Sequence, residues 1–144
     1  MYKKLLIAYD GSDGAKVALE RGLKIASEDK ATATVLWVQG SLPHYPETVS
    51  EVEQEKIAAS AYYHTLEKEV HKTVRQINYP AKFIVKQGNP SKTILNTAEE
   101  LKCDLIVVGG SGHSKLWDKF LGHVADKISE NAHCDVLIVR KKKK

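Results

Sequence analysis

Three glycines near the C-terminus have the spacing of a loop that could hold an anionic ligand. Gly109, Gly112 and Gly122 form the pattern G-x2-G-x9-G, directly after the apolar residues 105–108. Because glycine has no Cβ and adopts positive φ at little cost, a phosphate group can approach its backbone N–H groups closely. A helix that follows such a loop adds the partial positive charge of its N-terminus. The spacing therefore predicts a nucleotide-binding module.

The other common phosphate-binding motifs do not occur in the sequence. No Gly-Lys-Ser/Thr follows the glycines, which argues against a Walker-type NTPase, and G-x-G-x-x-G is missing where the first strand would end. The sequence contains no recognisable nucleophile–base pair and no metal-ligand cluster. We therefore expect a binding protein and name no catalytic residue, and slow ATP hydrolysis stays open.

The elements that must position these glycines alternate between strand and helix. The strand patterns are short apolar or β-branched runs, which we expect at residues 4–9, 32–38, 81–87, 104–108 and 136–139. Helical patterns lie between them, at residues 13–26, 47–77, 90–101 and 122–132. Ser12 or Asp13 caps the first helix, and Asn89 before Pro90 is a strong helix-start signal. Such alternation predicts an α/β fold, in which helices cover both faces of a parallel sheet.

In such a sheet, ligands bind beyond the carboxyl ends of the strands, at the point where the strand order reverses. With five strands, the first and the fourth flank that point. Ala8, Tyr9 and Asp10 end the first strand, and Gly109 to Gly112 follow the fourth. The fold and the glycine spacing thus predict the same site. For Asp10 a plain turn role, in which its carboxylate bonds its own backbone, is the alternative.

Composition and charge place the chain among globular proteins. Its 144 residues suit one domain over 1–144, with 42% hydrophobic and 28% charged residues. The net charge is +4, but Arg140 to Lys144 supply +5, so the rest carries 4 − 5 = −1. We expect this basic tail (140–144) to be a solvated end that blunts the last strand. Attraction to nucleic acid or a membrane is the alternative, and it is only weakly signalled because no aromatic residues interleave with the charges. The N-terminal residues read as a first strand and not as a signal peptide, which favours a cytoplasmic location.

Cys103 and Cys134 occupy similar positions, each before an aspartate and an apolar run. If those runs are neighbouring parallel strands in register, the two Cα atoms lie near the roughly 4.4–6.8 Å that a disulfide needs. Two reduced thiols in a reducing compartment are the alternative and the expected state.

The chain resembles single-domain, UspA-like universal stress proteins over essentially its whole length. The resemblance lies in the segments 6–12 (LIAYDGS), 88–90 (GNP), 103–109 (CDLIVVG) and 134–139 (CDVLIV), together with the three glycines. It implies a five-stranded, doubly wound parallel sheet, flavodoxin-like and Rossmann-like, in the order 3-2-1-4-5. It also implies a regulatory role in stress response through binding of ATP (or ADP or AMP).

The resemblance also implies roles for individual residues. The adenine would contact Ala8, Tyr9 and Val38, while Asp10 would lie near the ribose or an accompanying Mg²⁺. The backbones of a further group would face the ribose and the phosphates; these residues are Gly109, Gly110, Gly112, Gly122, His123 and Val124.

His123 departs from the ATP-binding branch of the family, which has Ser or Thr after the third glycine. The lost hydroxyl removes one neutral hydrogen bond, worth about 0.5–1.5 kcal/mol, whereas the backbone N–H remains. A charged imidazole could also donate to phosphate, and nucleotide binding would then tighten as pH falls through the ordinary histidine pKa of about 6.5. In the alternative the ring points to solvent or partly fills the site.

The last strand, Val136 to Arg140, reads as an apolar edge, and the resemblance implies an antiparallel homodimer through it. On this hypothesis Val139→Pro produces a monomer, if the Val139 N–H faces outward. Two functions stay open for such a dimer: an ATP-binding regulator, and a nucleotide-free adaptor with a vestigial site.

Overall fold

Strands and helices alternate along the chain as the sequence predicts. The computed structural model describes residues 1–40, 48–110 and 124–142. The elements are β1 (Lys4–Ala8), α1 (Asp13–Asp29), β2 (Thr32–Gln39), α2 (Val49–Ile77), β3 (Lys82–Gln87), α3 (Pro90–Glu100), β4 (Leu105–Gly109) and β5 (Asp135–Val139). Residues 124–131, here called the last helix, are also helical and precede β5.

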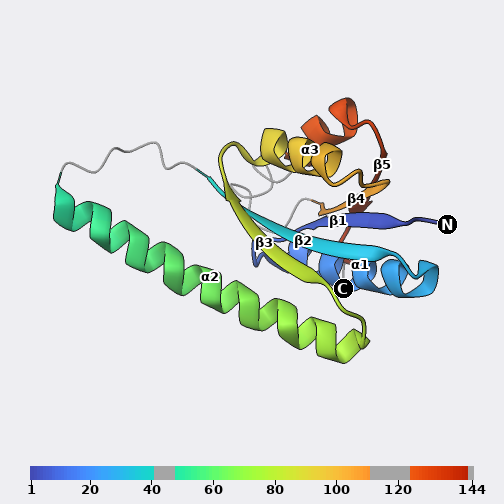
Figure 1. The fold of residues 1–144 in the computed structure, drawn as a ribbon, viewed down its shortest axis with the longest axis horizontal. Helices are drawn as coiled ribbons and strands as arrows, with labels where there is room; N and C mark the ends of the chain where they lie inside the picture. The colour runs from blue at the N-terminus through green and yellow to red at the C-terminus, as the bar shows by residue number, and fades with distance from the viewer. Residues whose placement is uncertain (41–47, 111–123, 143–144) are drawn as a thin grey trace.

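The five strands form one sheet in the order β3-β2-β1-β4-β5 (Figure 1). All four neighbouring pairs are parallel; β1 pairs with β4 through Leu5↔Leu105, and β4 with β5 through Leu105↔Asp135. This order confirms the predicted doubly wound α/β fold. It also makes β1 and β4 neighbours, so their carboxyl ends lie side by side.

The two faces of the sheet build separate cores because successive side chains of a strand point to opposite faces. Leu5 and Ile7 of β1 belong to the core under α1 and α2, whereas Leu6 between them belongs to the core under α3 and the last helix. Figure 1 shows these helix pairs on opposite sides of the sheet. Burial on both faces explains why the strands read as continuous apolar runs.

Two of the predicted helix starts are confirmed. Ser12 is the N-cap of α1, and its Oγ accepts the N–H of Ala15 at 3.2 Å. Asn89 caps α3 by accepting the N–H of Lys92 at 3.1 Å, with Pro90 in the first turn. The long helix begins at Val49, two residues later than predicted, because Thr48 is its cap.

Helix α1 lies very close to the sheet at Gly22, as a glycine among its apolar residues predicts. A Cβ on Gly22 would lie 2.7 Å from Cδ1 of Ile7. The spacing of apolar residues in α1 predicts a buried stripe of Ala15, Ala18, Leu19, Gly22, Ile25 and Ala26. It needs one correction: Leu23 is fully buried, whereas Ile25 is half-buried.

Helix α2 is amphipathic, with an apolar stripe over residues 59–77, but only part of that stripe is covered. Leu66 and Val70 are buried, whereas Ile57 is 69% exposed. The reason is length: 29 residues make a helix of about 43 Å, whereas the eight residues of β2 span about 27 Å. The N-terminal half of α2 therefore extends beyond the sheet (Figure 1).

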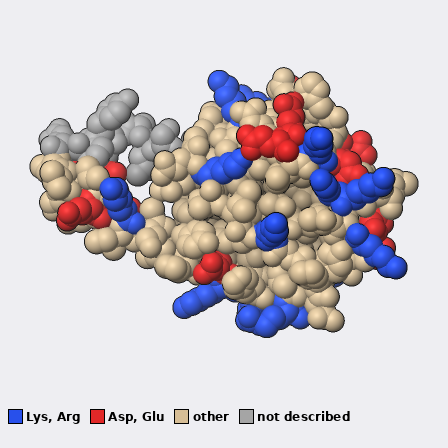
Figure 2. All heavy atoms as spheres, viewed as in Figure 1, with Lys and Arg blue, Asp and Glu red and all other residues tan. Residues whose placement is uncertain are grey.

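The surface carries both signs of charge. Figure 2 shows Lys and Arg intermixed with Asp and Glu on the face viewed there. In the basic tail, Lys141 Nζ lies 3.6 Å from a carboxylate oxygen of Asp13 at the start of α1. No helix in the described ranges combines the length and the apolar character that a membrane crossing requires.

Candidate functional site

A cavity of about 200 Å³ opens where β1 and β4 end. Its lining comes from five parts of the fold: Ala8, Tyr9, Asp10, Ser12 and Ala15 at the β1–α1 connection; Leu36 and Val38 of β2; Pro90 and Ile94 of α3; Val108 and Gly109 of β4; and Val124 and Ala125 of the last helix. The cavity therefore lies where the predicted site was expected, at the point where the strand order reverses.

The walls of the cavity are mostly aliphatic, and its polar groups gather at the β1–α1 turn. Asp10 Oδ1 accepts the backbone N–H of Ser12 at 2.9 Å, and Ser12 Oγ caps α1. One carboxylate oxygen of Asp10 therefore stabilises the turn, which is the alternative role considered for this residue. The first turn of α1 presents the positive end of its helix dipole to the same side.

Gly109 lets β4 approach the first turn of α1. A Cβ there would lie 2.7 Å from the carbonyl carbon and oxygen of Gly14 and 2.9 Å from the nitrogen of Ala15. Contacts this short with backbone atoms have no room to relax, so a side chain at this position would push the strand and the helix apart. The missing Cβ therefore shapes this edge of the cavity.

Of the ten residues predicted for the site, six line the cavity: Ala8, Tyr9, Asp10, Val38, Gly109 and Val124. Gly110 faces β5 instead, where its N–H donates to the carbonyl of Val139 at 2.7 Å. Gly112, Gly122 and His123 lie outside the described residues.

Sequence reasoning missed seven lining residues: Ser12, Ala15, Leu36, Pro90, Ile94, Val108 and Ala125. Two of them carried a usable signal. Leu36 lies two residues before Val38 and so on the same face of β2, and Ile94 lies one helical turn after Pro90. The others line the cavity only because of how the elements pack.

Tyr62 of α2 reaches the same turn from the other side of the sheet. Its hydroxyl donates to the carbonyl of Asp10, and its ring packs edge-on against Trp37, with centroids 5.3 Å apart. Burial, followed by the carboxylates of Asp10 and Glu69, raises the pKa of Tyr62, so the hydroxyl stays a donor. Tyr62 belongs to the apolar stripe of α2, and its side chain is 43% exposed beside the site.

The described residues contain no built metal centre. Across 1–40, 48–110 and 124–142, no group of three or more His, Cys, Asp or Glu side chains is arranged to hold an ion. The arrangement instead suits a small organic ligand: an aliphatic hollow with a few polar groups at one rim.

Comparison with known proteins gives the same family as the sequence resemblance. The universal stress protein family matches residues 1–140. The universal stress protein YxiE of Bacillus subtilis is 34% identical over 153 residues, covering 97% of this chain and 100% of YxiE.

Two solved structures share the fold. A universal stress protein in complex with cAMP superposes with a TM-score of 0.75 at 24% identity, covering 98% of this chain and 99% of that one. The protein At3g01520 of Arabidopsis thaliana with AMP bound gives 0.67 at 24% identity, covering 97% and 92%. From the family match over residues 1–140 and the 34% identity to YxiE, the chain belongs to the universal stress protein family.

Proposed function

We propose that this chain binds an adenine nucleotide in the cavity between β1 and β4 and acts as a regulatory module in stress response. One observation carries the proposal: an aliphatic cavity lies beside Gly109, at the end of β4, where the strand order of the sheet reverses. ATP is the expected nucleotide, with ADP and AMP as smaller members of the same class.

The aliphatic part of the cavity suits a purine ring. Ala8, Val38 and Ile94 come from three different elements and converge on it. A flat, weakly polar base gains from leaving water for such a surface, by about 25 cal/mol per Å² of apolar area buried. Backbone groups at the ends of β1 and β2 can then supply the polar contacts that orient the base.

The phosphates would lie toward Gly109 and the first turn of α1. The N-terminus of α1 favours negative charge there. Asp10 would face the ribose or a Mg²⁺ carried by the nucleotide, while Gly112, Gly122 and His123 keep their predicted phosphate roles. Because one oxygen of Asp10 accepts the Ser12 N–H, a nucleotide-borne ion would meet the other.

Proteins of the same fold support this assignment. One is a universal stress protein in complex with cAMP, and another has AMP bound. Both ligands contain adenine, ribose and phosphate. In this chain the aliphatic cavity would contact the adenine, Asp10 the ribose and the glycines the phosphate.

We also propose a homodimer that pairs β5 with its copy. β5 is an edge strand, and Ile138 is 36% exposed on it. The proline test suggested by the sequence chooses the wrong residue, however. The carbonyl of Val139 accepts the N–H of Gly110 on the β4 side of the strand. The N–H and C=O of one strand residue point to the same side, so the N–H of Val139 also faces β4. The direction alternates along the strand, so the N–H and C=O of Ile138 face away from β4.

Titration calorimetry of the purified full chain with ATP, AMP and GTP tests the nucleotide proposal. We expect the two adenine nucleotides to bind and GTP to bind at least about tenfold more weakly, a difference of about 1.4 kcal/mol. Mass spectrometry of ligand released from the purified protein gives a second readout. No released nucleotide and no calorimetric binding would leave the nucleotide-free adaptor as the function.

A pair of matched variants tests the location. Val38→Asp places an unpaired carboxylate in the aliphatic wall and should weaken ATP binding by at least about tenfold. Val85→Asp makes the same change on the neighbouring strand β3, where the side chain is 42% exposed, and should leave binding unchanged. Equal effects of both variants would show that the nucleotide binds elsewhere.

A further inference from the structure

Cys103 and Cys134 precede neighbouring strands, at the opposite end of the sheet from the nucleotide cavity. Both are half-buried free thiols. β4 and β5 begin in register, with Leu105 opposite Asp135, and neighbouring strands run about 4.8 Å apart. Cys134 directly precedes Asp135, and Cys103 lies two residues before Leu105. The backbone thus brings the two cysteines to the same edge, offset by one residue.

The two thiols also lie on the same face of the sheet. Both pack against the core under α3 and the last helix, and both line one small cavity of about 90 Å³. One water occupies about 30 Å³ in the liquid, so this cavity is large enough for a molecule the size of hydrogen peroxide.

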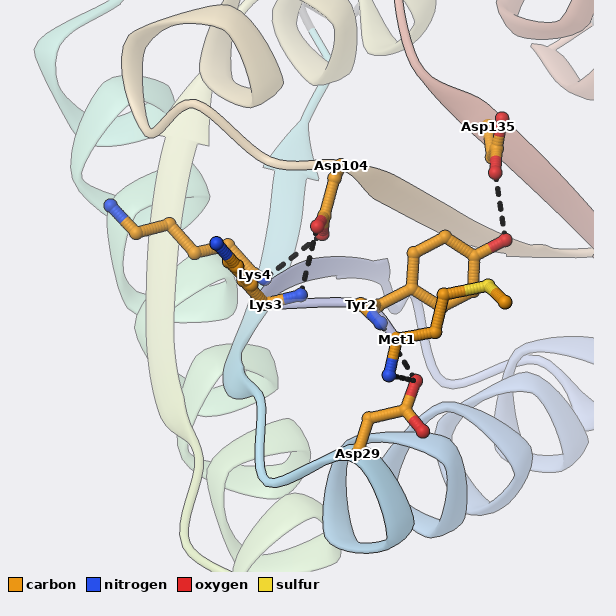
Figure 3. Close-up of polar contacts among 7 residues, drawn as sticks. All are labelled: Met1, Tyr2, Lys3, Lys4, Asp29, Asp104 and Asp135. Carbon is orange, nitrogen blue, oxygen red and sulfur yellow. Dashed lines mark hydrogen bonds and ion pairs between the residues drawn. The ribbon is translucent and has the colours of Figure 1, made fainter.

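Each cysteine is held in place by the aspartate that follows it. Asp104 accepts the backbone N–H groups of Lys3 and Lys4 at 2.8 and 2.9 Å, and Asp135 accepts the Tyr2 hydroxyl at 2.8 Å. Figure 3 shows these carboxylates directed toward the N-terminal segment. In each Cys-Asp pair the two residues therefore have different surroundings: the aspartate carboxylate bonds the N-terminal segment, and the cysteine lines the small cavity.

The surroundings of the thiols disfavour their charged forms. Burial is the main cause that raises the pKa of Cys103 to about 11; the neighbouring Cys134 and Asp104 add to it, and Lys4 opposes it. Burial, then Asp135 and Asp104, raise the pKa of Cys134. Glu99, Lys102 and His133 also line the cavity, with His133 Nε2 3.4 Å from Glu99 Oε1. Thiols in such a setting react slowly near neutral pH, because the thiolate is the nucleophile.

We propose that Cys103 and Cys134 are a modification site, at which a peroxide converts the two thiols into a reversible intramolecular disulfide. The sulfur of one cysteine attacks a peroxide oxygen; the O–O bond breaks, and a sulfenic acid and one water result. The sulfur of the other cysteine then attacks the sulfenic sulfur, and the S–O bond breaks with loss of a second water. Two thiols are oxidised and one hydrogen peroxide is reduced to two waters. A thiol reductant reverses the bond by exchange.

The bond would join the amino ends of two strands across 134 − 103 = 31 positions of the chain. That span includes Gly109, Val124 and Ala125, which line the nucleotide cavity. Oxidation at one end of β4 would therefore restrain the segment that forms part of the site at the other end.

The test uses the full chain treated with hydrogen peroxide, then alkylated under denaturing conditions and weighed intact. The chain contains two cysteines, so the assignment is unambiguous. We expect both thiols to be lost in a species of single-chain mass and to return with dithiothreitol. The melting temperature should rise by roughly 5–10 °C on oxidation. The initial rate should rise about tenfold per pH unit in mildly alkaline buffer, as expected below a pKa of about 11.

The variants Cys103→Ser and Cys134→Ser are the matched controls. Each retains one thiol, which can take up oxygen or glutathione but cannot form the internal bond, so the rise in melting temperature should be absent. Two alkylatable thiols after oxidation of the wild-type chain would overturn the proposal. So would sulfinic acids or chain-to-chain disulfides as the only products.

Discussion

The hydroxyl of Tyr9 donates a 2.5 Å hydrogen bond to Oε2 of Glu69, joining the end of β1 to the middle of α2. The backbone of Tyr9 is fixed as well, since its N–H donates to the carbonyl of Leu36 at 2.9 Å. Burial and then Glu69 raise the pKa of Tyr9, so the hydroxyl remains a donor. A residue that lines the candidate site is thus fixed from two directions.

Tyr9→Phe removes this bond and keeps the ring. Glu69 loses this donor, and because its side chain is only half-buried, water can partly replace the lost bond. We therefore expect the free energy of unfolding, measured in urea, to fall by about 1 kcal/mol. Tyr63→Phe is the matched control, because Tyr63 bonds Glu67 within the same helix at 3.1 Å. Its cost should be under half as large, and equal costs would contradict the view that Tyr9 and Glu69 join the sheet to α2.

Gly109→Ala tests the close approach of β4 to α1. A Cβ only 2.7 Å from backbone atoms of Gly14 must move one element, at a cost of about 1–3 kcal/mol in the free energy of unfolding. Affinity for ATP should fall with it, because the same contact shapes the cavity rim. Gly40→Ala is the control, since a Cβ there meets nothing within 4 Å, and it should leave both quantities unchanged.

Asp10→Asn separates the turn role of Asp10 from its proposed charge role. The amide oxygen can still accept the Ser12 N–H, so the free energy of unfolding should change little. If Asp10 meets a nucleotide-borne Mg²⁺, the variant should lose most of the gain that Mg²⁺ gives to ATP binding, with AMP binding unchanged. Calorimetry with and without Mg²⁺ measures both, and an unchanged gain would exclude Asp10 as a contact of the ion.

Asp104 should make folding stability depend on pH. Burial acts to raise the pKa of this carboxyl, but the N–H groups of Lys4 and Lys3 outweigh it and hold the pKa below the ordinary 3.8. The unfolded chain then binds the proton more readily, so the contribution is present above 3.8 and is lost as pH falls through the lower, folded value.

Urea unfolding of Asp104→Asn against wild type, from about pH 7 down to about pH 3, measures this contribution. The variant should be less stable at neutral pH, and the difference should shrink as pH falls below 3.8. A difference that stays constant with pH would contradict the role given to the Asp104 charge.

Ile138→Pro tests the proposed dimer. Proline removes an N–H that the alternation of the strand directs away from β4, so the variant should sediment as a monomer while its far-UV circular dichroism is retained. Ile138→Ala keeps the N–H and should stay dimeric. A monomeric wild-type chain would dismiss the β5 pairing.

Much of the fold could be predicted because local signals and global packing agree. Asn89 with Pro90 marks the start of α3, and the apolar runs of β1 and β4 reflect burial on both faces. The length of α2 could be predicted, but its exposed N-terminal half could not, because an apolar pattern does not say how far the surface that it packs against extends.

The cavity residues at strand ends are easier to predict from the sequence than those on helices. Asp10 and Gly109 follow from strand ends, which the topology brings together. Pro90 and Ala125 line the cavity because of how α3 and the last helix pack, and neither residue type by itself indicates a place in a binding site. Gly110 directly follows Gly109 but faces β5 and not α1, and the spacing of the glycines does not indicate this difference.

The overhang of α2 has a mechanical consequence. Leu66 anchors the helix, and its first residue, Val49, lies 66 − 49 = 17 positions away, a lever arm of about 26 Å. A tilt of about 5° at the anchor, four residues from the Tyr62 that touches the Asp10 carbonyl, sweeps that far tip through about 2 Å. A small tilt of α2 beside the cavity therefore produces a larger displacement at the exposed N-terminal end of the helix, where another molecule could contact it.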